Sequence, residues 1–173
     1  MAFISLIFGG ARSGKSARAL TLARRPPHLF FATAEALDAE MAARIARHRA
    51  ERGASWAVRE EPLELAAAIR AEAAPERTIL VDCLTLWLSN LMHRERDPEA
   101  ETDGLLDALA AAPGRAVLVS NEVGMGLAPV NALGRAFRDE QGRLNRRVAE
   151  RADHAEFVAA GLPLTLKGAP PES

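Results

Sequence analysis

The sequence predicts a single α/β domain with a mostly parallel central sheet flanked by helices. Two observations predict this fold class: short apolar runs alternate with longer helical patterns, and the first run leads directly into a glycine-rich loop followed by a helix. Such alternation is typical of parallel sheets covered on both faces, whose ligands bind at the carboxyl ends of the strands. We expect residues 1–168 to form the domain and residues 169–173 to form a frayed tail.

The expected strands are apolar runs bounded by turn-forming residues. They cover residues 3–8, 28–32, 56–58, 78–82 and 116–120, and a closing pair at 155–159 and 162–166. The second strand follows a break at Pro26 and Pro27, and Gly161 is placed to turn the closing pair into a hairpin.

Helical periodicity appears between these runs. The expected helices cover residues 17–24, 38–52, 62–73, 84–92, 99–112 and 131–151. Pro62 suits a first helical turn and Gly53 suits a C-terminal stop, whereas Gly134 and Gly142 are weak points of the last helix. Residues 121–129 are rich in glycine and are expected to form an irregular loop over the sheet.

The composition excludes several classes of protein. A formal net charge of -1 implies no general attraction to nucleic acid or to acidic membranes. Lysine occurs only at Lys15 and Lys167, so any anion-binding surface is built mainly from arginine. The single cysteine, Cys83, cannot form an intrachain disulfide, which fits a reducing cytoplasm. No run approaches the length of a membrane span, and the apolar N-terminal stretch is interpreted as a core strand.

The loop after the first strand carries a complete G-x-x-x-x-G-K-S phosphate-binding motif. Its residues are Gly9, Gly10, Ala11, Arg12, Ser13, Gly14, Lys15 and Ser16. The glycines let backbone N–H groups close around phosphate oxygens, and the helix N-terminus adds partial positive charge. Lys15 can reach the β- and γ-phosphates, and the Ser16 hydroxyl can ligate Mg²⁺. The motif predicts a P-loop NTPase-like fold that binds a nucleoside triphosphate.

Acidic residues end two later strands. Asp82 is placed to hold Mg²⁺ directly or through water, the alternative being a helix N-cap. Cys83 follows where hydrolytic ATPases often carry a glutamate, which favours a transferase over a hydrolase. Glu122, after Asn121, could contact a substrate or the γ-phosphate, but it fits an ordinary strand-to-helix turn equally well.

A basic segment contains the most unusual histidine. On a helix, His48 shares a face with Met41 and Ile45, and Arg44 and Arg52 stand one turn on either side of it. Nearby cations would keep the imidazole neutral and nucleophilic and could also grip a triphosphate. From the residues alone, a partly buried histidine at the edge of a basic helix is the simpler interpretation.

Several stretches together resemble one family. They are the phosphate loop, residues 32–34, residues 38–45, His48 and Arg49, Trp56, Glu60, residues 81–85, residues 120–126, residues 137–139, residues 142–145 and residues 161–168. With these motifs the chain resembles the bifunctional adenosylcobinamide kinase/adenosylcobinamide-phosphate guanylyltransferases of cobalamin biosynthesis. The phosphate loop alone would not single out this family, whereas the combination does.

The resemblance implies two reactions at or near one nucleotide site. ATP or GTP phosphorylates adenosylcobinamide, and GTP then donates GMP to that phosphate through a GMP-histidine intermediate, giving adenosylcobinamide-GDP. The resemblance makes His48 the nucleophile and so reverses the simpler interpretation. Besides the phosphate loop, it implies nucleotide contacts at Ala32, Thr33, Ala34, Arg49, Ala50, Glu51, Arg52, Glu60 and Asp82. It also implies a homotrimer.

Two other functions stay open from the residues. One is a P-loop kinase for another small hydroxylated substrate, with His48 merely structural. The other is a nucleotide-binding regulatory protein in which residues 121–129 act as a switch. Neither requires a nucleophile one helical turn from arginines.

Overall fold

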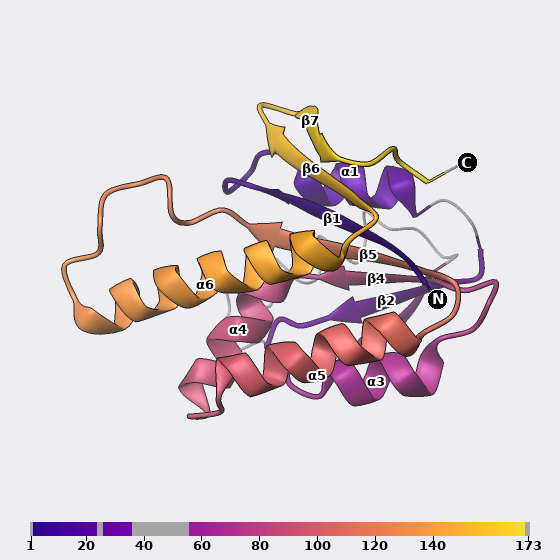
Figure 1. The fold of residues 1–173 in the computed structure, drawn as a ribbon, viewed down its shortest axis with the longest axis horizontal. Helices are drawn as coiled ribbons and strands as arrows, with labels where there is room; N and C mark the ends of the chain where they lie inside the picture. The colour runs from indigo at the N-terminus through magenta and orange to yellow at the C-terminus, as the bar shows by residue number, and fades with distance from the viewer. Residues whose placement is uncertain (1, 24–25, 36–55, 172–173) are drawn as a thin grey trace.

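A computed structural model describes residues 2–23, 26–35 and 56–171 and shows a sheet with helices on both faces (Figure 1). The strands are β1 (Phe3–Gly9), β2 (His28–Ala32), β3 (Trp56–Glu60), β4 (Thr78–Asp82), β5 (Arg115–Asn121), β6 (His154–Ala159) and β7 (Leu162–Lys167). Their order across the sheet is β3-β2-β4-β5-β1-β6-β7, and all pairs except β6 with β7 are parallel. The predicted fold class is confirmed, while the expected helix at 38–52 lies outside the described residues.

Helices cover the two faces of the sheet unequally. They are α1 (Lys15–Leu22), α3 (Leu65–Glu72), α4 (Leu84–His93), α5 (Pro98–Ala111) and α6 (Ala132–Arg151). In the described part of the chain, α1 lies on one face and the other four helices lie on the opposite face (Figure 1). Among these helices none is both long and apolar enough to cross a bilayer.

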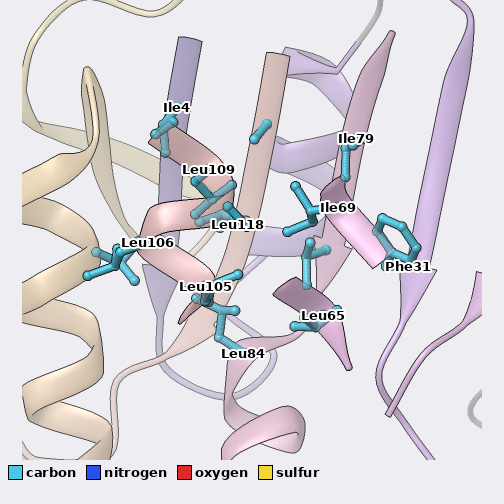
Figure 2. Packing of buried hydrophobic residues seen from close by; sticks show 14 of the residues in the cluster. Ile4, Phe31, Leu65, Ile69, Ile79, Leu84, Leu105, Leu106, Leu109 and Leu118 are labelled. Carbon is cyan, nitrogen blue, oxygen red and sulfur yellow. The ribbon is translucent and has the colours of Figure 1, made fainter. Parts of the chain in front are cut away.

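Side-chain alternation along the strands builds two cores. In β1, Leu6 belongs to the cluster beneath α3 to α6, and its neighbour Ile7 belongs to the cluster beneath α1. In β2, Phe31 belongs to the cluster beneath α3 to α6, and Phe30 belongs to the cluster beneath α1. Figure 2 shows the larger cluster, in which leucines of α3 and α5 pack on the aliphatic side chains of the sheet. A sheet buried on both faces explains why the strands read as nearly continuous apolar runs.

Two helix starts differ from expectation by more than one residue. The helix expected from Pro62 begins at Leu65, because the Glu61 carboxylate accepts hydrogen bonds from the amides of Leu63 (3.3 Å) and Glu64 (2.8 Å) and holds the chain in a turn. The first helix begins at Lys15, two residues before the expected start.

Neither of the two expected weak points interrupts the last helix. α6 continues as one helix of 20 residues through Gly134 and Gly142. At its start, Asn131 accepts a hydrogen bond from the Gly134 amide (2.6 Å), and this N-cap places the first glycine in a stabilised turn.

Candidate active site

The predicted phosphate loop connects the end of β1 to the start of α1. Gly14 is the N-cap of α1 and has a φ of 95°, a left-handed conformation that glycine adopts at little cost. The Lys15 ammonium lies in the loop, 8% exposed, and donates to the carbonyl of Gly10 at 3.0 Å. The Ser13 amide donates to the same carbonyl at 3.3 Å. The loop therefore curls around its lysine, as a phosphate site requires.

Close packing explains the first glycine of the motif. A Cβ at Gly9 would lie 2.2 Å from the carbonyl oxygen of Val158 in β6. A larger residue would force β1 and β6 apart at the point where the loop begins. Arg12, at the tip of the loop, is exposed and has a φ of 56°.

Strand register brings the predicted residues to one edge of the sheet. Ala32 pairs with Glu60 on one side and with Asp82 on the other, and Asp82 pairs with Val119. Gly9 pairs with Asn121. Parallel strands end at the same edge, so segments far apart in sequence form one row beside the phosphate loop.

The pKa of the Cys83 thiol depends on its burial and on two nearby charges. Burial, with the Asp82 carboxylate adding to it, raises the pKa of this thiol to about 11, while the Lys15 ammonium acts in the opposite direction. Asp82 precedes Cys83 in the chain, and Lys15, at the start of α1, acts on the same thiol from a distant part of the sequence. A protonated thiol is neither a nucleophile nor a metal ligand, so Cys83 fills space beside the site.

Thr33 joins the ends of two strands. Its side chain is fully buried, and its hydroxyl donates to the Cys83 carbonyl (2.7 Å) and accepts from the Cys83 amide (2.8 Å). The Asn90 amide group of α4 donates to the Thr33 carbonyl (2.8 Å). The Thr33 hydroxyl is thus used within the protein, where it fixes the end of β2 against the residue that follows Asp82.

A buried polar network holds the end of β5, and the sequence did not reveal it. The Ser120 hydroxyl donates to Asn145 Oδ1 (2.6 Å) and accepts from Gln141 Nε2 (2.9 Å). Asn145 Nδ2 donates to the Asn121 carbonyl (2.9 Å), and the Asn121 amide donates to the Thr85 hydroxyl (2.7 Å). The available signal was an amide pair spaced i, i+4 on the side of α6 that also buries Leu144.

Glu122, the first residue after β5, lies beside the phosphate loop. Its amide donates to the carbonyl of Gly9 at 3.0 Å, and its carboxylate accepts from the amide of Gly124. The carboxylate is thus used in a local turn next to the site. The remaining predicted residues, His48, Arg49, Ala50, Glu51 and Arg52, lie outside the described part of the chain.

A strand, loop and helix with a buried lysine share one edge of the sheet with the Asp82 carboxylate, which ends β4 on the far side of β5. Together these features define a P-loop nucleotide-binding protein. The sequence profile of one family, described as cobinamide kinase / cobinamide phosphate guanyltransferase, matches residues 5–166. The chain belongs to this family, and the resemblance seen in its motifs is confirmed.

Three relatives of known function align with this chain over nearly their full length. The bifunctional adenosylcobalamin biosynthesis protein CobP of Pseudomonas aeruginosa is 51% identical, over 95% of this chain and 98% of the relative. The bifunctional adenosylcobalamin biosynthesis proteins CobU of Salmonella typhimurium and Escherichia coli are 41% and 37% identical, each over 94% of this chain and 98% of the relative. These relatives support the bifunctional interpretation rather than a kinase without guanylyl transfer.

Proposed function

We propose that the chain performs both reactions that its family is named for. It transfers the γ-phosphoryl group of ATP or GTP to the hydroxyl of adenosylcobinamide, and then transfers GMP from GTP to the resulting phosphate. The observation that carries the proposal is the phosphate loop at the carboxyl edge of the sheet, with its lysine buried and Asp82 close by.

The residues of the loop supply binding and charge stabilisation. The N-terminus of α1 offers backbone N–H donors to phosphate oxygens, and Lys15 places a cation where negative charge accumulates during transfer. Because the loop is curled by its own hydrogen bonds, its donors are oriented before a nucleotide arrives.

The residues at the loop also fit Mg²⁺. Ser16 lies in the first turn of α1 with a partly exposed side chain, and Asp82 ends β4 with a partly exposed carboxylate. Hydroxyl and carboxylate oxygens are the hard donors that Mg²⁺ prefers. Bound there with the nucleotide, the ion would neutralise phosphate charge, and Ser16 and Asp82 would hold it.

The guanylyl step is assigned to His48 on sequence alone. The imidazole attacks the α-phosphorus of GTP, the bond to the bridging oxygen of the β-phosphate breaks, and pyrophosphate leaves. A phosphate oxygen of adenosylcobinamide phosphate then attacks the same phosphorus and frees the imidazole. The arginines at 49 and 52 would offset the charge of the departing pyrophosphate.

The proposal includes a homotrimer, which the family resemblance implies, and a cytoplasmic location, which the single cysteine favours. Large apolar side chains exposed on β7 and on the segment before α6 support association between copies. They are Leu162 (73%), Leu164 (61%) and Leu166 (55%) on β7, and Met125 (78%), Leu127 (97%) and Val130 (96%) on the other segment, with Leu133 (71%) in the first turn of α6. Light scattering after size-exclusion chromatography tests the trimer: a mass of one chain would refute it.

The guanylyl step is tested with Mg²⁺ and α-³²P-labelled GTP. We expect acid-labile, alkali-stable label on the wild type and on a His93→Ala control, since His93 is exposed at the end of α4, and none on His48→Ala. Label that persists on His48→Ala would refute this nucleophile.

The kinase step is tested separately with γ-labelled ATP or GTP and adenosylcobinamide. Labelled adenosylcobinamide phosphate is expected from the wild type and from His48→Ala, because the first transfer does not use the histidine. Nucleotide binding without either product would favour a regulatory protein instead.

A further inference from the structure

The turn between β6 and β7 touches the phosphate loop. The Gly161 amide donates to the carbonyl of Ser13 at 2.8 Å. Close to this hydrogen bond, a Cβ at Gly14 would lie 3.2 Å from the Cα of Gly161. Two residues almost 150 positions apart in sequence thus form a tight backbone contact in the middle of the nucleotide motif.

This hydrogen bond fixes the orientation of one peptide unit. The Ser13 carbonyl and the Gly14 amide belong to the same planar trans peptide, so they point in opposite directions. When Gly161 holds the carbonyl outward, the Gly14 N–H is directed to the other side. Gly14 is the N-cap of α1, where N–H groups have no acceptor within the helix and are available to an anion.

The same hairpin fixes both ends of the loop. At the start, Gly9 packs against the Val158 carbonyl of β6. Beyond the end, Arg18 of α1 makes two hydrogen bonds to the buried carboxylate of Glu156, both at 2.7 Å. The turn is therefore the middle of three contacts, and it is the one that forms a hydrogen bond with a peptide of the motif.

Gly161 is required by its backbone conformation rather than by lack of space. Its φ is +80°, and a Cβ placed on it would meet no atom within 4 Å. Ala160 before it is also left-handed, with a φ of 52°. A side chain at 161 would be accommodated, but most side chains would pull the backbone out of this conformation and move the N–H away from Ser13.

We infer that Gly161 is a positioning residue for the phosphate site, acting through the Ser13 carbonyl to aim the Gly14 N–H at a nucleotide phosphate. The inference rests on the proposed nucleotide site. It assigns to the C-terminal hairpin a part in nucleotide affinity that goes beyond its place in the sheet.

The experiment compares Gly161→Val with Gly161→Asn by titrating each protein with GTP and Mg²⁺ in a calorimeter. Asparagine tolerates the left-handed conformation and keeps the N–H, whereas a β-branched residue disfavours that conformation. We expect affinity within about twofold of the wild type for Asn and about tenfold weaker for Val. In ¹⁵N-labelled protein, the shift of the Gly14 amide resonance on GTP addition should be kept in Asn and reduced in Val.

Gly168→Ala is the matched control, at the other end of the same hairpin. Its φ is +60° and a Cβ would lie 1.9 Å from the Asp153 carbonyl oxygen, so the variant should melt at a lower temperature yet bind GTP like the wild type while folded. Should the Val variant fail to fold, Gly161→Ala takes its place in the same comparison.

Three results would overturn the inference: a folded Val or Ala variant that binds like the wild type, equal loss in Val and Asn, or an equal loss in Gly168→Ala. Absence of GTP binding by the wild type itself would overturn the proposed nucleotide site as well. The two failures are therefore distinguishable.

Discussion

Two loops leave the same edge of the sheet from neighbouring strands, and they differ in how they are held. Residues 9–16 lead from the end of β1 into α1 and are held from within, with Ser13 and Lys15 each only 8% exposed although Arg12 at the tip is exposed. Residues 122–131 follow β5, and they extend away from the sheet before α6 begins (Figure 1). Leu127 there is 97% exposed and Val130 is 96% exposed.

The second loop is held near its two ends, where Arg135 of α6 donates to the carbonyls of Pro129 (3.1 Å) and Val130 (2.8 Å). Thr85 and Asn145 hold the backbone of Asn121 at its start, and the Asn131 side chain caps α6 at its end. The phosphate site therefore obtains its shape from the chain itself, whereas the middle of the second loop, around Leu127, is exposed to solvent.

Lys15→Ala should have the largest effect. It removes the cation at the phosphates, so we expect the rate of phosphoryl transfer to fall by about a hundredfold or more. The control is Lys167→Ala, which removes the only other lysine. Lys167 donates to the carbonyls of Ala149 (3.0 Å) and Glu150 (2.9 Å), so its loss should cost roughly 0.5–1.5 kcal/mol of unfolding free energy and leave the rate unchanged. Equal activity of the two variants would refute the role of Lys15.

Arg18→Ala tests the attachment of α1 to the hairpin. The variant leaves the carboxylate of Glu156, 1% exposed, without its two guanidinium donors, so we expect a loss of about 3 kcal/mol in the free energy of unfolding. Urea denaturation measures it. Arg146→Ala, which removes an exposed arginine 3.6 Å from Glu150, should change the same quantity by less than about 0.5 kcal/mol. Similar losses of unfolding free energy in the two variants would mean that the ion pair of Arg18 with Glu156 does not stabilise the attachment of α1 to the hairpin.

Asn145→Ala tests the base of the second loop. It removes partners of Ser120, Gln141 and the Asn121 carbonyl at once, and buried polar groups left without partners cost about 1–3 kcal/mol. We expect a loss near the middle of that range by urea denaturation. Asn131→Ala, which removes only the helix cap, should cost about 1 kcal/mol. A loss no larger than that of Asn131→Ala would argue against a cooperative network.

Acidic pH should weaken the attachment beneath α1. Burial lowers the pKa of His154 from its ordinary 6.5, and the hydrogen bonds from Arg18 lower the pKa of Glu156 from 4.5. Both groups bind protons more readily in the unfolded chain than in the folded protein. Their contribution to the free energy of unfolding is therefore complete above about pH 6.5. It is lost as the pH falls, first as His154 is protonated and then as Glu156 is protonated. Melting temperatures at pH 7.5 and 5.5 measure the change, and His154→Gln should show a smaller difference between them. If His154→Gln shows the same difference in melting temperature as the wild type, His154 is not a source of the pH dependence.

Leu127→Ser should have the smallest effect on folding. The side chain is almost fully exposed, so the free energy of unfolding should change by less than about 0.5 kcal/mol. Leu118→Ala, in the fully buried part of β5, should cost about 3 kcal/mol. A large loss from Leu127→Ser at low protein concentration would show that the loop has intramolecular support after all.

The sequence predicted the local features of the site and missed the long-range ones. The predicted bounds of β2 are confirmed because Pro26 and Pro27 break the chain just before the strand and an apolar run follows them. The phosphate loop was visible because its chemistry depends on neighbours in sequence. By contrast, the contact of Ser13 with Gly161 joins residues whose proximity depends on sheet order, which local spacing does not specify. The polar network on α6 was missed because its one signal, the amide pair Gln141 and Asn145, is weak in a helix rich in charges.

The position of β1 in the sheet has a consequence for synthesis on the ribosome. This strand is made first, yet both of its neighbours, β5 and β6, come from the second half of the chain. An apolar strand must therefore wait unpaired while more than a hundred later residues are added. The nascent chain carries a complete nucleotide motif long before it carries a nucleotide site, and during that interval its unpaired apolar strand is prone to aggregation.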